Sequence, residues 1–377
     1  MIEMNHLAKY QLVLTVRSPV FAGSGLEVAK KEYYFDQRNK QVHILNLEKF
    51  IGLIVGKGLM DAYENYILRG AWNVYLDGFF RDHNISRTEI EAITSYKIDS
   101  ADALTPEHSL KEIKLFMRDS AQRPYIPGSS LKGALRTAIL AKMLLDDSGK
   151  RDRNAGLFLS AIRDGRQPGD RNYAKKATEQ VEEYYLHTLG LNKNKPKDAV
   201  NSVMRGVSVS DSLPVRDKDA MILCGKRDLS VAGLVKPINV VRECLRPGVK
   251  VFFDLCLDSS IPSGIDLNYI KEAIRDFGSY YAGSFDSRFK KPAGAAAEKF
   301  QNALILGGGA GFFSKTFAYE LLGRAEGLKF VSNYMKNSFR LHKHEKDLET
   351  GISPHRLKYT VYRNQSWHFG VCGVEIY

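Results

Sequence analysis

The chain has 377 residues, 44% of them hydrophobic and 26% charged, so it can bury a sizeable core as one elaborated domain or two. Its 55 lysines and arginines outnumber 43 acidic residues, and the resulting net charge of +12 favours a polyanionic partner. The sequence has no run of about eighteen apolar residues, which excludes a membrane-spanning helix. It also has no C-x-x-C pair and no basic leader, so we expect free thiols and a cytoplasmic protein.

The N-terminal third predicts strands followed by a helical insertion. Residues 10–16 alternate between apolar and polar and are rich in β-formers, and a loop of small residues follows at 18–25. Residues 32–36 and 41–45 flank a polar turn and predict a hairpin. From residue 47 to about 96, apolar side chains recur every three or four positions, which is typical of helices with aromatic groups in their core.

The stretch 124–136 predicts a tight turn into a helix. Two prolines keep its entry extended, and Gly128 permits a sharp turn before an apolar stripe at helical spacing. A helix start with free amides, hydroxyls and cations favours phosphate binding, and an ordinary capped amphipathic helix is the alternative. The predicted phosphate ligands are Ser129, Ser130, Lys132 and Arg136, with one of the two serines as the helix cap.

The rest of the chain predicts a second insertion and then a mixture of strands and helices. Residues 146–201 begin with a polar break and end with a basic loop at 192–197, which is either a solvated face or an RNA contact. The sequence Arg-Pro-Gly at 246–248 predicts a hairpin turn between two strands. The other predicted elements are strands at 206–212, 221–224, 303–306 and 370–377, and helices at 178–189, 267–281 and 316–335.

A glycine-rich loop follows the predicted strand at 303–306. It differs from a P-loop because Ser314 stands where the last glycine belongs, and the acidic strand at 251–254 precedes it within a predicted hairpin. Consecutive glycine amides can instead surround anionic oxygens, although a tight structural turn would also use them. The predicted contacts to an RNA backbone are Gly307, Gly308, Gly309, Gly311 and Lys315.

Other candidate sites are less specific. Aromatic and basic residues alternate in 280–291, where Arg288 and Lys290 could contact RNA while the aromatic groups stack on bases or complete a helix face. The histidines at 342 and 344 lie in a charged run that is typical of a solvated segment, so we expect no metal. No cofactor motif and no protease or esterase motif occurs. Acid–base chemistry has Glu27, His43 and Asp211 as candidates, none with an evident second group.

Residues 126–136 and the glycine-rich loop resemble the two signatures of RAMP proteins in type III CRISPR effector complexes. This form of the loop, together with the segment Ser353–Lys358 and the overall length, is most similar to the fifth Csm protein of type III-A complexes. The residue pattern by itself predicts only an α+β fold. The resemblance implies a ferredoxin-like antiparallel sheet over residues 1–320, with insertions at about 47–110 and 146–201. A C-terminal helix and strand, 321–377, would then pack on this core.

The resemblance also implies a function. Such a protein is a non-catalytic RNA-binding subunit of an antiviral Csm complex that caps the 3′ end of the crRNA and supports crRNA maturation. Its partners would be crRNA, other Csm subunits, especially the repeated backbone RAMP subunit, and recruited host nucleases. One alternative is a RAMP-type endoribonuclease that cuts precursor or target RNA, and another is a scaffold that binds only proteins.

Overall fold

The first strand lies at the centre of a five-stranded antiparallel sheet. The computed structural model describes residues 6–69, 75–104, 111–165, 174–339 and 344–377. The strand order is β11-β14-β1-β10-β7, so the C-terminal strand β14 lies between β11 and β1. The bounds are β1 (Leu7–Val16), β7 (Val207–Val209), β10 (Lys250–Asp258), β11 (Ala303–Ile305) and β14 (Val371–Ile376).

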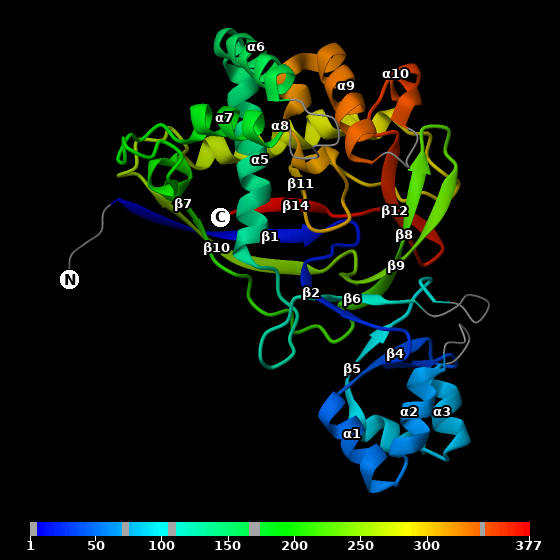
Figure 1. Cartoon of the computed structure of the whole chain (residues 1–377). Helices are drawn as coiled ribbons and strands as arrows, with labels where there is room; N and C mark the ends of the chain where they lie inside the picture. Colours follow the sequence, from blue (N-terminus) through cyan, green and yellow to red (C-terminus); the bar gives the residue numbers. More distant parts are fainter. Residues whose placement is uncertain (1–5, 70–74, 105–110, 166–173, 340–343) are drawn as a thin grey trace, which may run out of the picture.

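Two long helices, α5 (Gly128–Asp146) and α8 (Leu267–Ser284), pack on one face of this sheet (Figure 1). Each has an apolar stripe, and side chains such as Leu131 and Ile270 are completely buried. The order β1-α5-β7-β10-α8, closed by β14, is the ferredoxin-like plan, and the predicted α+β fold is confirmed. Strand β14 is an inner strand of this sheet. The domain boundary at residue 320 stays a prediction.

A second sheet of nine strands lies beside the first. Its main path is β2-β6-β9-β8-β5-β4-β3, and β12 joins it by pairing with β8 and β13. The two sheets share one continuous hydrophobic core. The bounds are β2 (Gly23–Val28), β3 (Tyr33–Asp36), β4 (Gln41–Leu45), β5 (Thr94–Asp99), β6 (Ile113–Phe116), β8 (Met221–Ser230), β9 (Val235–Leu245), β12 (Arg356–Tyr362) and β13 (Gln365–His368).

One predicted hairpin is confirmed and another is wrong. Strands β3 and β4 pair across the polar turn as expected. The turn at 246–248 instead joins two different sheets, because β9 pairs with β8 and β6 whereas β10 pairs with β1 and β7. The segment 16–20 separates these strands: the carbonyl of Val249 accepts from the amide of Val16, and Leu245 exchanges hydrogen bonds with Val20. The true hairpin partner of β9 is β8, which is longer than the predicted strand at 221–224.

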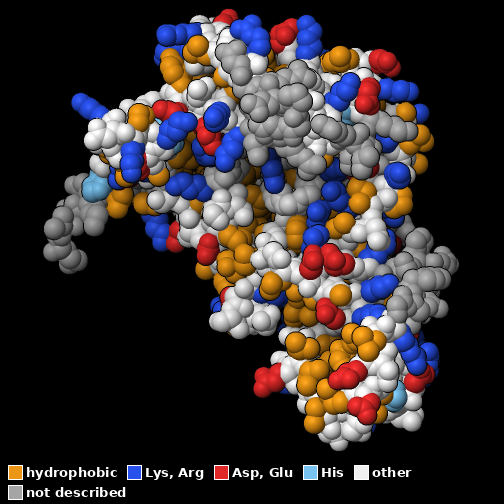
Figure 2. Space-filling view, viewed as in Figure 1, with side chains coloured by type: hydrophobic (Ala, Val, Ile, Leu, Met, Phe, Trp, Pro, Cys, Tyr) orange, Lys and Arg blue, Asp and Glu red, His pale blue; other side chains and the backbone are white. Residues whose placement is uncertain are grey.

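The first insertion forms a separate helical lobe with its own small core. Asn46 caps α1, and Ser86 with Glu89 forms a capping box on α4. Figure 2 shows hydrophobic side chains on the surface of this lobe and many lysines and arginines over the larger body. The residues after 93, predicted to be helical, form β5 instead. The lobe helices are α1 (Leu47–Gly56), α2 (Met60–Leu68), α3 (Leu76–Asp82) and α4 (Arg87–Ile93).

The second insertion and the C-terminal segment pack around α5. Helix α6 (Ser148–Gly165) begins inside the predicted polar break at 146–154, which is therefore largely helical, and α7 (Lys175–Leu186) follows. Helix α9 (Ala318–Ser338) contains a non-helical residue, Gly323, with φ of +69°. Part of the charged stretch 163–176 lies outside the described residues. All four cysteines are free. Among the described residues, no helix has the length and apolar character that a bilayer crossing requires.

Candidate nucleic-acid interface

The N-terminus of α5 already holds an anion from the protein itself. The Gly128 amide donates a 2.8 Å hydrogen bond to the carboxylate of Asp211. A Cβ atom at Gly128 would lie 2.3 Å from the carbonyl oxygen of Ser210, so only glycine allows this approach. The helix cap is Pro127, with no side-chain hydrogen bond, and the prediction that Ser129 or Ser130 caps the helix is therefore wrong. The carboxylate already uses one amide of this helix start, and phosphate binding by Ser129, Ser130, Lys132 and Arg136 stays a prediction.

The two predicted cations of α5 have different surroundings. Arg136 is engaged in an ion pair with Glu182 of α7, at 2.6 Å, so its charge is compensated. Lys132 is half-buried, and burial lowers its pKa. Within the described part of the chain, the ammonium of Lys132 has no hydrogen-bond or ion-pair partner. Of the four predicted phosphate ligands on α5, Lys132 is thus the one that offers an uncompensated charge.

The glycine-rich loop packs against the segment that follows β1. Gly307, Gly309 and Gly311 have φ values of +88°, +94° and +99°, a backbone conformation that favours glycine. The Gly308 amide donates a 2.8 Å hydrogen bond to the carbonyl of Phe21, and a Cβ at Gly307 would lie 2.3 Å from that oxygen. The glycines therefore serve tight packing, as the structural-turn interpretation predicts, and the contact to an RNA backbone stays a prediction.

Arg242 of β9 reaches this loop although the sequence did not single it out. Its Nε and Nη1 atoms are buried and lack a hydrogen-bond partner in the described residues. A Cβ at Gly309 would lie 2.4 Å from Nη1, and the guanidinium carbon lies 5.1 Å from the ring centre of Phe21. Burial lowers the pKa of Arg242. A buried guanidinium with unused donors is costly, and an anionic ligand would satisfy it.

Two further cations, Lys226 and Lys358, lie near Arg242. Burial first, and then the charges of Lys358 and Arg242, lower the pKa of Lys226 on β8 to about 8. Lys358 of β12 pairs with Asp228 at 2.5 Å, and its Cγ would lie 3.5 Å from a Cβ at Gly311. We call residues 307–311 with Arg242, Lys226 and Lys358 the glycine-loop site. It contains three cations and one nearby acid, so its net charge is positive.

A hollow of about 650 Å³ adjoins the glycine-loop site. Lys226 and Lys358 line it together with Phe312 and the exposed Phe339. Cations beside exposed aromatic rings are typical of sites that hold a phosphate and stack on a base. The sequence did not predict this hollow, because its walls come from β8, β12 and α9, which are far apart in the chain.

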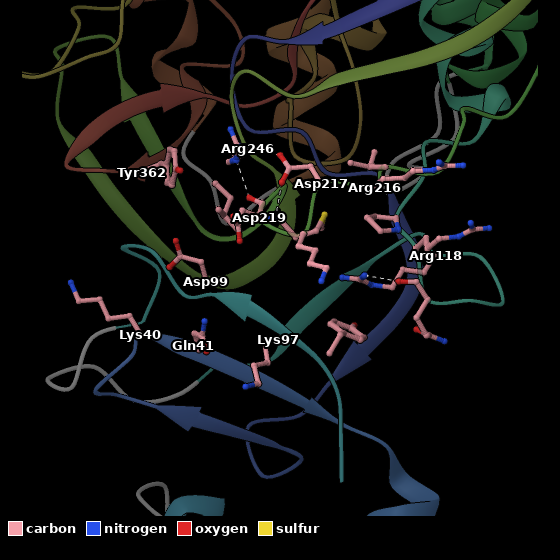
Figure 3. Close-up of a pocket in the computed structure, with 18 of the residues that line it drawn as sticks. Lys40, Gln41, Lys97, Asp99, Arg118, Arg216, Asp217, Asp219, Arg246 and Tyr362 are labelled. Atoms are coloured by element: carbon pink, nitrogen blue, oxygen red, sulfur yellow. Dashed lines mark hydrogen bonds and ion pairs between the residues drawn. The ribbon is translucent and has the colours of Figure 1, made fainter. Parts of the chain in front are cut away.

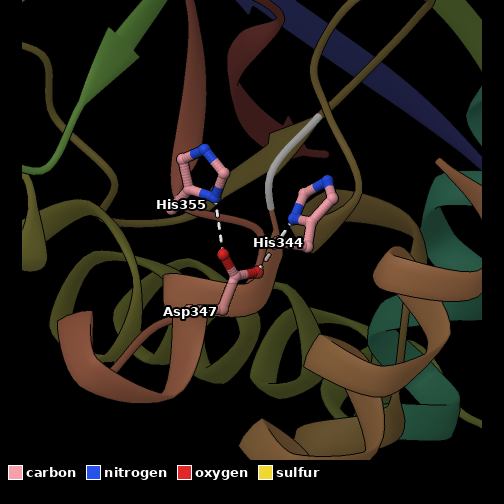
Figure 4. A group of neighbouring side chains, drawn as sticks. All are labelled: His344, Asp347 and His355. Atoms are coloured by element: carbon pink, nitrogen blue, oxygen red, sulfur yellow. Dashed lines mark hydrogen bonds and ion pairs between the residues drawn. The ribbon is translucent and has the colours of Figure 1, made fainter. Parts of the chain in front are cut away.

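A hydrogen-bonded cluster at the edge of this hollow joins two histidines to one aspartate (Figure 4). Nδ1 of His344 lies 2.9 Å from one carboxylate oxygen of Asp347, and Nδ1 of His355 lies 2.5 Å from the other. Burial acts to raise the pKa of Asp347, but hydrogen bonds from His355, Ser353 and His344 lower it overall. The three ligand atoms lie within 4.8 Å of one another, as a metal site would require. The carboxylate is already satisfied and the surrounding residues are cationic, so the arrangement favours an anion in the hollow. His342 lies outside the described residues.

Lys315, Arg288 and Lys290 are not among the residues that line the hollow beside the glycine-loop site. Lys315 is exposed and lines a different cavity of about 350 Å³ beside α9. Arg288 and Lys290 are exposed, and the Lys290 amide bonds to Val231 at the turn between β8 and β9. The aromatic groups that alternate with them are mainly core, since Tyr281, Phe285 and Phe289 are at most 3% exposed. Base stacking by those three rings is excluded.

The three acid–base candidates lie in separate environments. Glu27 is exposed, and a hydrogen bond from Lys114 lowers its pKa. His43 is 2% exposed, has its Nδ1 3.0 Å from the hydroxyl of Thr94, and has a pKa lowered by burial. Asp211 accepts the hydrogen bond of the α5 N-terminus. The fold does not bring these residues together, so they do not form an acid–base pair.

Comparisons with known proteins identify the family. A model of the RAMP superfamily matches residues 13–372, and the chain belongs to this superfamily. It is 26% identical to the Csm5 protein of the CRISPR system of Mycobacterium tuberculosis (strain CDC 1551 / Oshkosh), with 98% of each chain covered. The likeness to the fifth Csm protein, predicted from the sequence signatures, is confirmed.

Solved structures agree on the fold. A crystal structure of Csm5 from T. onnurineus superposes with a TM-score of 0.65 at 17% identity, covering 96% of this chain and 99% of that one. A chain in a cryo-EM structure of a type III-A Csm–crRNA–target RNA ternary complex gives a TM-score of 0.60 at 19% identity. That match covers 97% of this chain and all of the other.

Proposed function

We propose that this protein is a non-catalytic RNA-binding subunit of a type III-A CRISPR Csm complex, where it caps the 3′ end of the crRNA. The glycine-loop site holds the RNA backbone by its phosphates, and pairing between guide and target supplies the sequence selectivity. One observation carries this proposal: Arg242 and Lys226 are desolvated cations without hydrogen-bond or ion-pair partners among the described residues, and Arg242 lies against the half-buried glycine loop. A phosphate chain supplies the missing acceptors.

The partners follow from the likeness to Csm5 and to a chain of a Csm–crRNA–target RNA complex. In this proposal the protein lies next to the repeated backbone RAMP subunit at the end of a cytoplasmic assembly. It supports crRNA maturation through recruited host nucleases, because its own acid–base candidates are dispersed. A reconstituted complex without this subunit should then leave the 3′ end of its crRNA open to added nucleases.

The experiment is a binding assay with labelled guide RNA at several salt concentrations. Wild-type protein should bind with an affinity that falls as salt rises, and the Arg242→Ala/Lys226→Ala double variant should lose about two phosphate contacts. For single strands this reduces the salt slope by about 1.4. The Lys49→Ala/Lys271→Ala variant removes equal charge from exposed faces of α1 and α8 and should bind normally.

Two outcomes would favour the alternatives. Discrete RNA cuts, with or without divalent metal, that one point change abolishes would support an endoribonuclease. An RNA affinity unaffected by the Arg242→Ala/Lys226→Ala change, or no binding at any salt concentration, would support a scaffold that contacts only proteins. Intact RNA with a salt-sensitive shift supports the proposed capping subunit.

A further inference from the structure

A second basic hollow lies on the opposite face of the nine-stranded sheet. Arg242 and Glu243 are neighbours on β9, so their side chains project to opposite faces. Arg242 projects to the glycine-loop site, whereas Glu243 contacts Tyr96 and Arg118, which line a hollow of about 1070 Å³. We call this the far-face hollow. Figure 3 shows its walls: Lys40 and Lys97 lie on one side and Arg246 with Asp217 on the other.

The far-face hollow has an excess of positive charge. Eight lysines and arginines line it against three aspartates. Four of these cations are engaged in ion pairs, namely Arg246 with Asp217, Lys97 with Glu91, Arg118 with Glu243 and Arg123 with Asp119, and the other four lack an ion pair within the described residues. These uncompensated cations come from three separate loops, and all are exposed: Lys40, Arg216, Lys218 and Arg363. Cations that converge on a concave surface from separate loops concentrate the potential there and attract a polyanion.

The inner wall of the hollow is rigid. Glu243 is fully buried and accepts hydrogen bonds from the amide of Phe116 at 2.8 Å and the hydroxyl of Tyr96 at 2.9 Å. The side chain of Arg118 is 10% exposed, pairs with Glu243 at 3.4 Å and lies 3.8 Å above the ring centre of Tyr96. This buried network holds the wall of the hollow in place beneath the exposed lysines and arginines of its rim. A preformed binding site requires such a fixed wall.

Two strands connect the far-face hollow with the glycine-loop site. Strand β9 carries Arg242 at the glycine loop, and Arg246 follows its end at the hollow. Strand β12 carries Lys358 at the glycine loop, and Arg363 follows its end at the hollow. At about 3.3 Å per residue, each pair is separated by roughly 13–17 Å along the strand. Since β8 is antiparallel to both β9 and β12, these two strands end at the same end of the sheet, and along them the cations of the two sites are within the reach of a few nucleotides.

We propose that the far-face hollow binds the next segment of the single-stranded RNA held at the glycine-loop site, so that one strand contacts both faces of the sheet. This inference rests on the proposed function, because it extends the same RNA. RNA is favoured over an acidic protein segment because the hollow continues the proposed path of a phosphate chain. Its cations act without base readout, as contacts to a backbone do.

The test compares two lengths of oligouridine on the full-length protein. The Lys218→Ala/Arg363→Ala variant should weaken binding of a strand of about 14 nucleotides by roughly five- to tenfold and reduce its salt slope by about 1.4. The same variant should bind a strand of about 5 nucleotides like wild type, since that length fills only the glycine-loop site. The charge-matched Lys49→Ala/Lys271→Ala variant should leave both affinities unchanged.

Several outcomes would overturn the inference. Equal losses on the short and the long strand, no loss on the long strand, or the same loss in the control variant would each exclude a second RNA segment. Polyglutamate is tested in parallel as a competitor for the same hollow. If it binds wild type as tightly as the long RNA does, and this binding is lost in the Lys218→Ala/Arg363→Ala variant, the hollow is assigned to an acidic protein instead. Failure of the short strand to bind wild type would refute the glycine-loop site. Loss of the long strand in the hollow variant would still support RNA in the hollow.

Discussion

Replacing Gly309 by alanine should weaken RNA binding by displacing Arg242. A Cβ at Gly309 would lie 2.4 Å from Nη1 of Arg242, whereas an ordinary contact begins at 3.4 Å, so the guanidinium must move by about 1 Å. A hydrogen bond to a charged group contributes roughly 1.5–3 kcal/mol. Because the side chain is displaced but retained, we expect the lower end, which is about a tenfold rise in Kd for guide RNA.

Gly25, which lies outside the glycine-loop site, provides the matched control. Its φ of +85° is close to the +94° of Gly309, so alanine at either position causes similar left-handed strain of about 1–2 kcal/mol. A Cβ at Gly25 has no heavy atom within 4 Å and displaces nothing. From the average unfolding entropy per residue, both variants should lower Tm by about 1–3 °C.

The assay is fluorescence anisotropy with labelled guide RNA, accompanied by thermal unfolding of each variant. Gly309→Ala should raise Kd while Gly25→Ala stays near wild type, although both unfold at similarly lowered temperatures. Equal losses of affinity in the two variants would show that backbone strain, and not the position of Arg242, governs binding. An Arg242→Gln variant sets the largest loss that displacement of this side chain can produce.

Three further predictions concern titratable groups. Because the pKa of Lys226 is about 8, its charge is lost between pH 7 and 9, and RNA affinity at constant ionic strength should fall in this window. The Lys226→Arg variant should bind RNA with no such pH dependence. A flat pH profile of the wild-type affinity would contradict this prediction. Asp211→Ala leaves the α5 N-terminus without its anion and should lower the free energy of unfolding by about 1 kcal/mol. Urea unfolding measures this change. An unchanged urea midpoint would show that the carboxylate does not stabilise the helix. The folded-state pKa of Asp347 is lowered, so its stabilisation is present at neutral pH and is lost as the carboxylate is protonated in acid. Asp347→Asn should therefore lower Tm at pH 7 and do so less as pH falls through that titration, and a constant difference would refute this account.

The sequence predicted elements whose partners are close in the chain. The hairpin of β3 and β4 and the start of α5 near Gly128 depend on turn chemistry within a few residues. The hairpin at 246–248 failed because β9 and β10 have better partners in two different sheets. Local propensity favoured a turn at 246–248, and a turn exists there. The pairing of the two flanking strands, however, is decided by segments more than 200 residues away in the chain, such as 16–20.

The candidate site shows the same limit. The glycine run was evident in the sequence, but Arg242 looked like any polar residue within a strand. Its significance depends on Phe21 and Gly309, which lie 221 residues before it and 67 residues after it in the chain. The available signal was a charged pair, Arg242 and Glu243, inside the otherwise apolar end of β9. Adjacent charges in a strand must face opposite sides of a sheet, so both faces near that point are expected to be polar.

The divergence of the two sheets explains why Arg242 of the glycine-loop site remains uncompensated. At 246–248 the chain leaves one sheet for the other, and the segment around Phe21 fills the junction together with the glycine loop. Backbone from these segments surrounds Arg242, but glycine provides no carboxylate and the Phe21 carbonyl already accepts from Gly308. A carboxylate beside Arg242 would satisfy its unused donors in the free protein, but a side chain at Gly307 or Gly309 would collide with Phe21 or with Arg242 itself. The unsatisfied charge of Arg242 therefore lowers the stability of the free protein. Binding of an external anion satisfies this charge and stabilises the folded state.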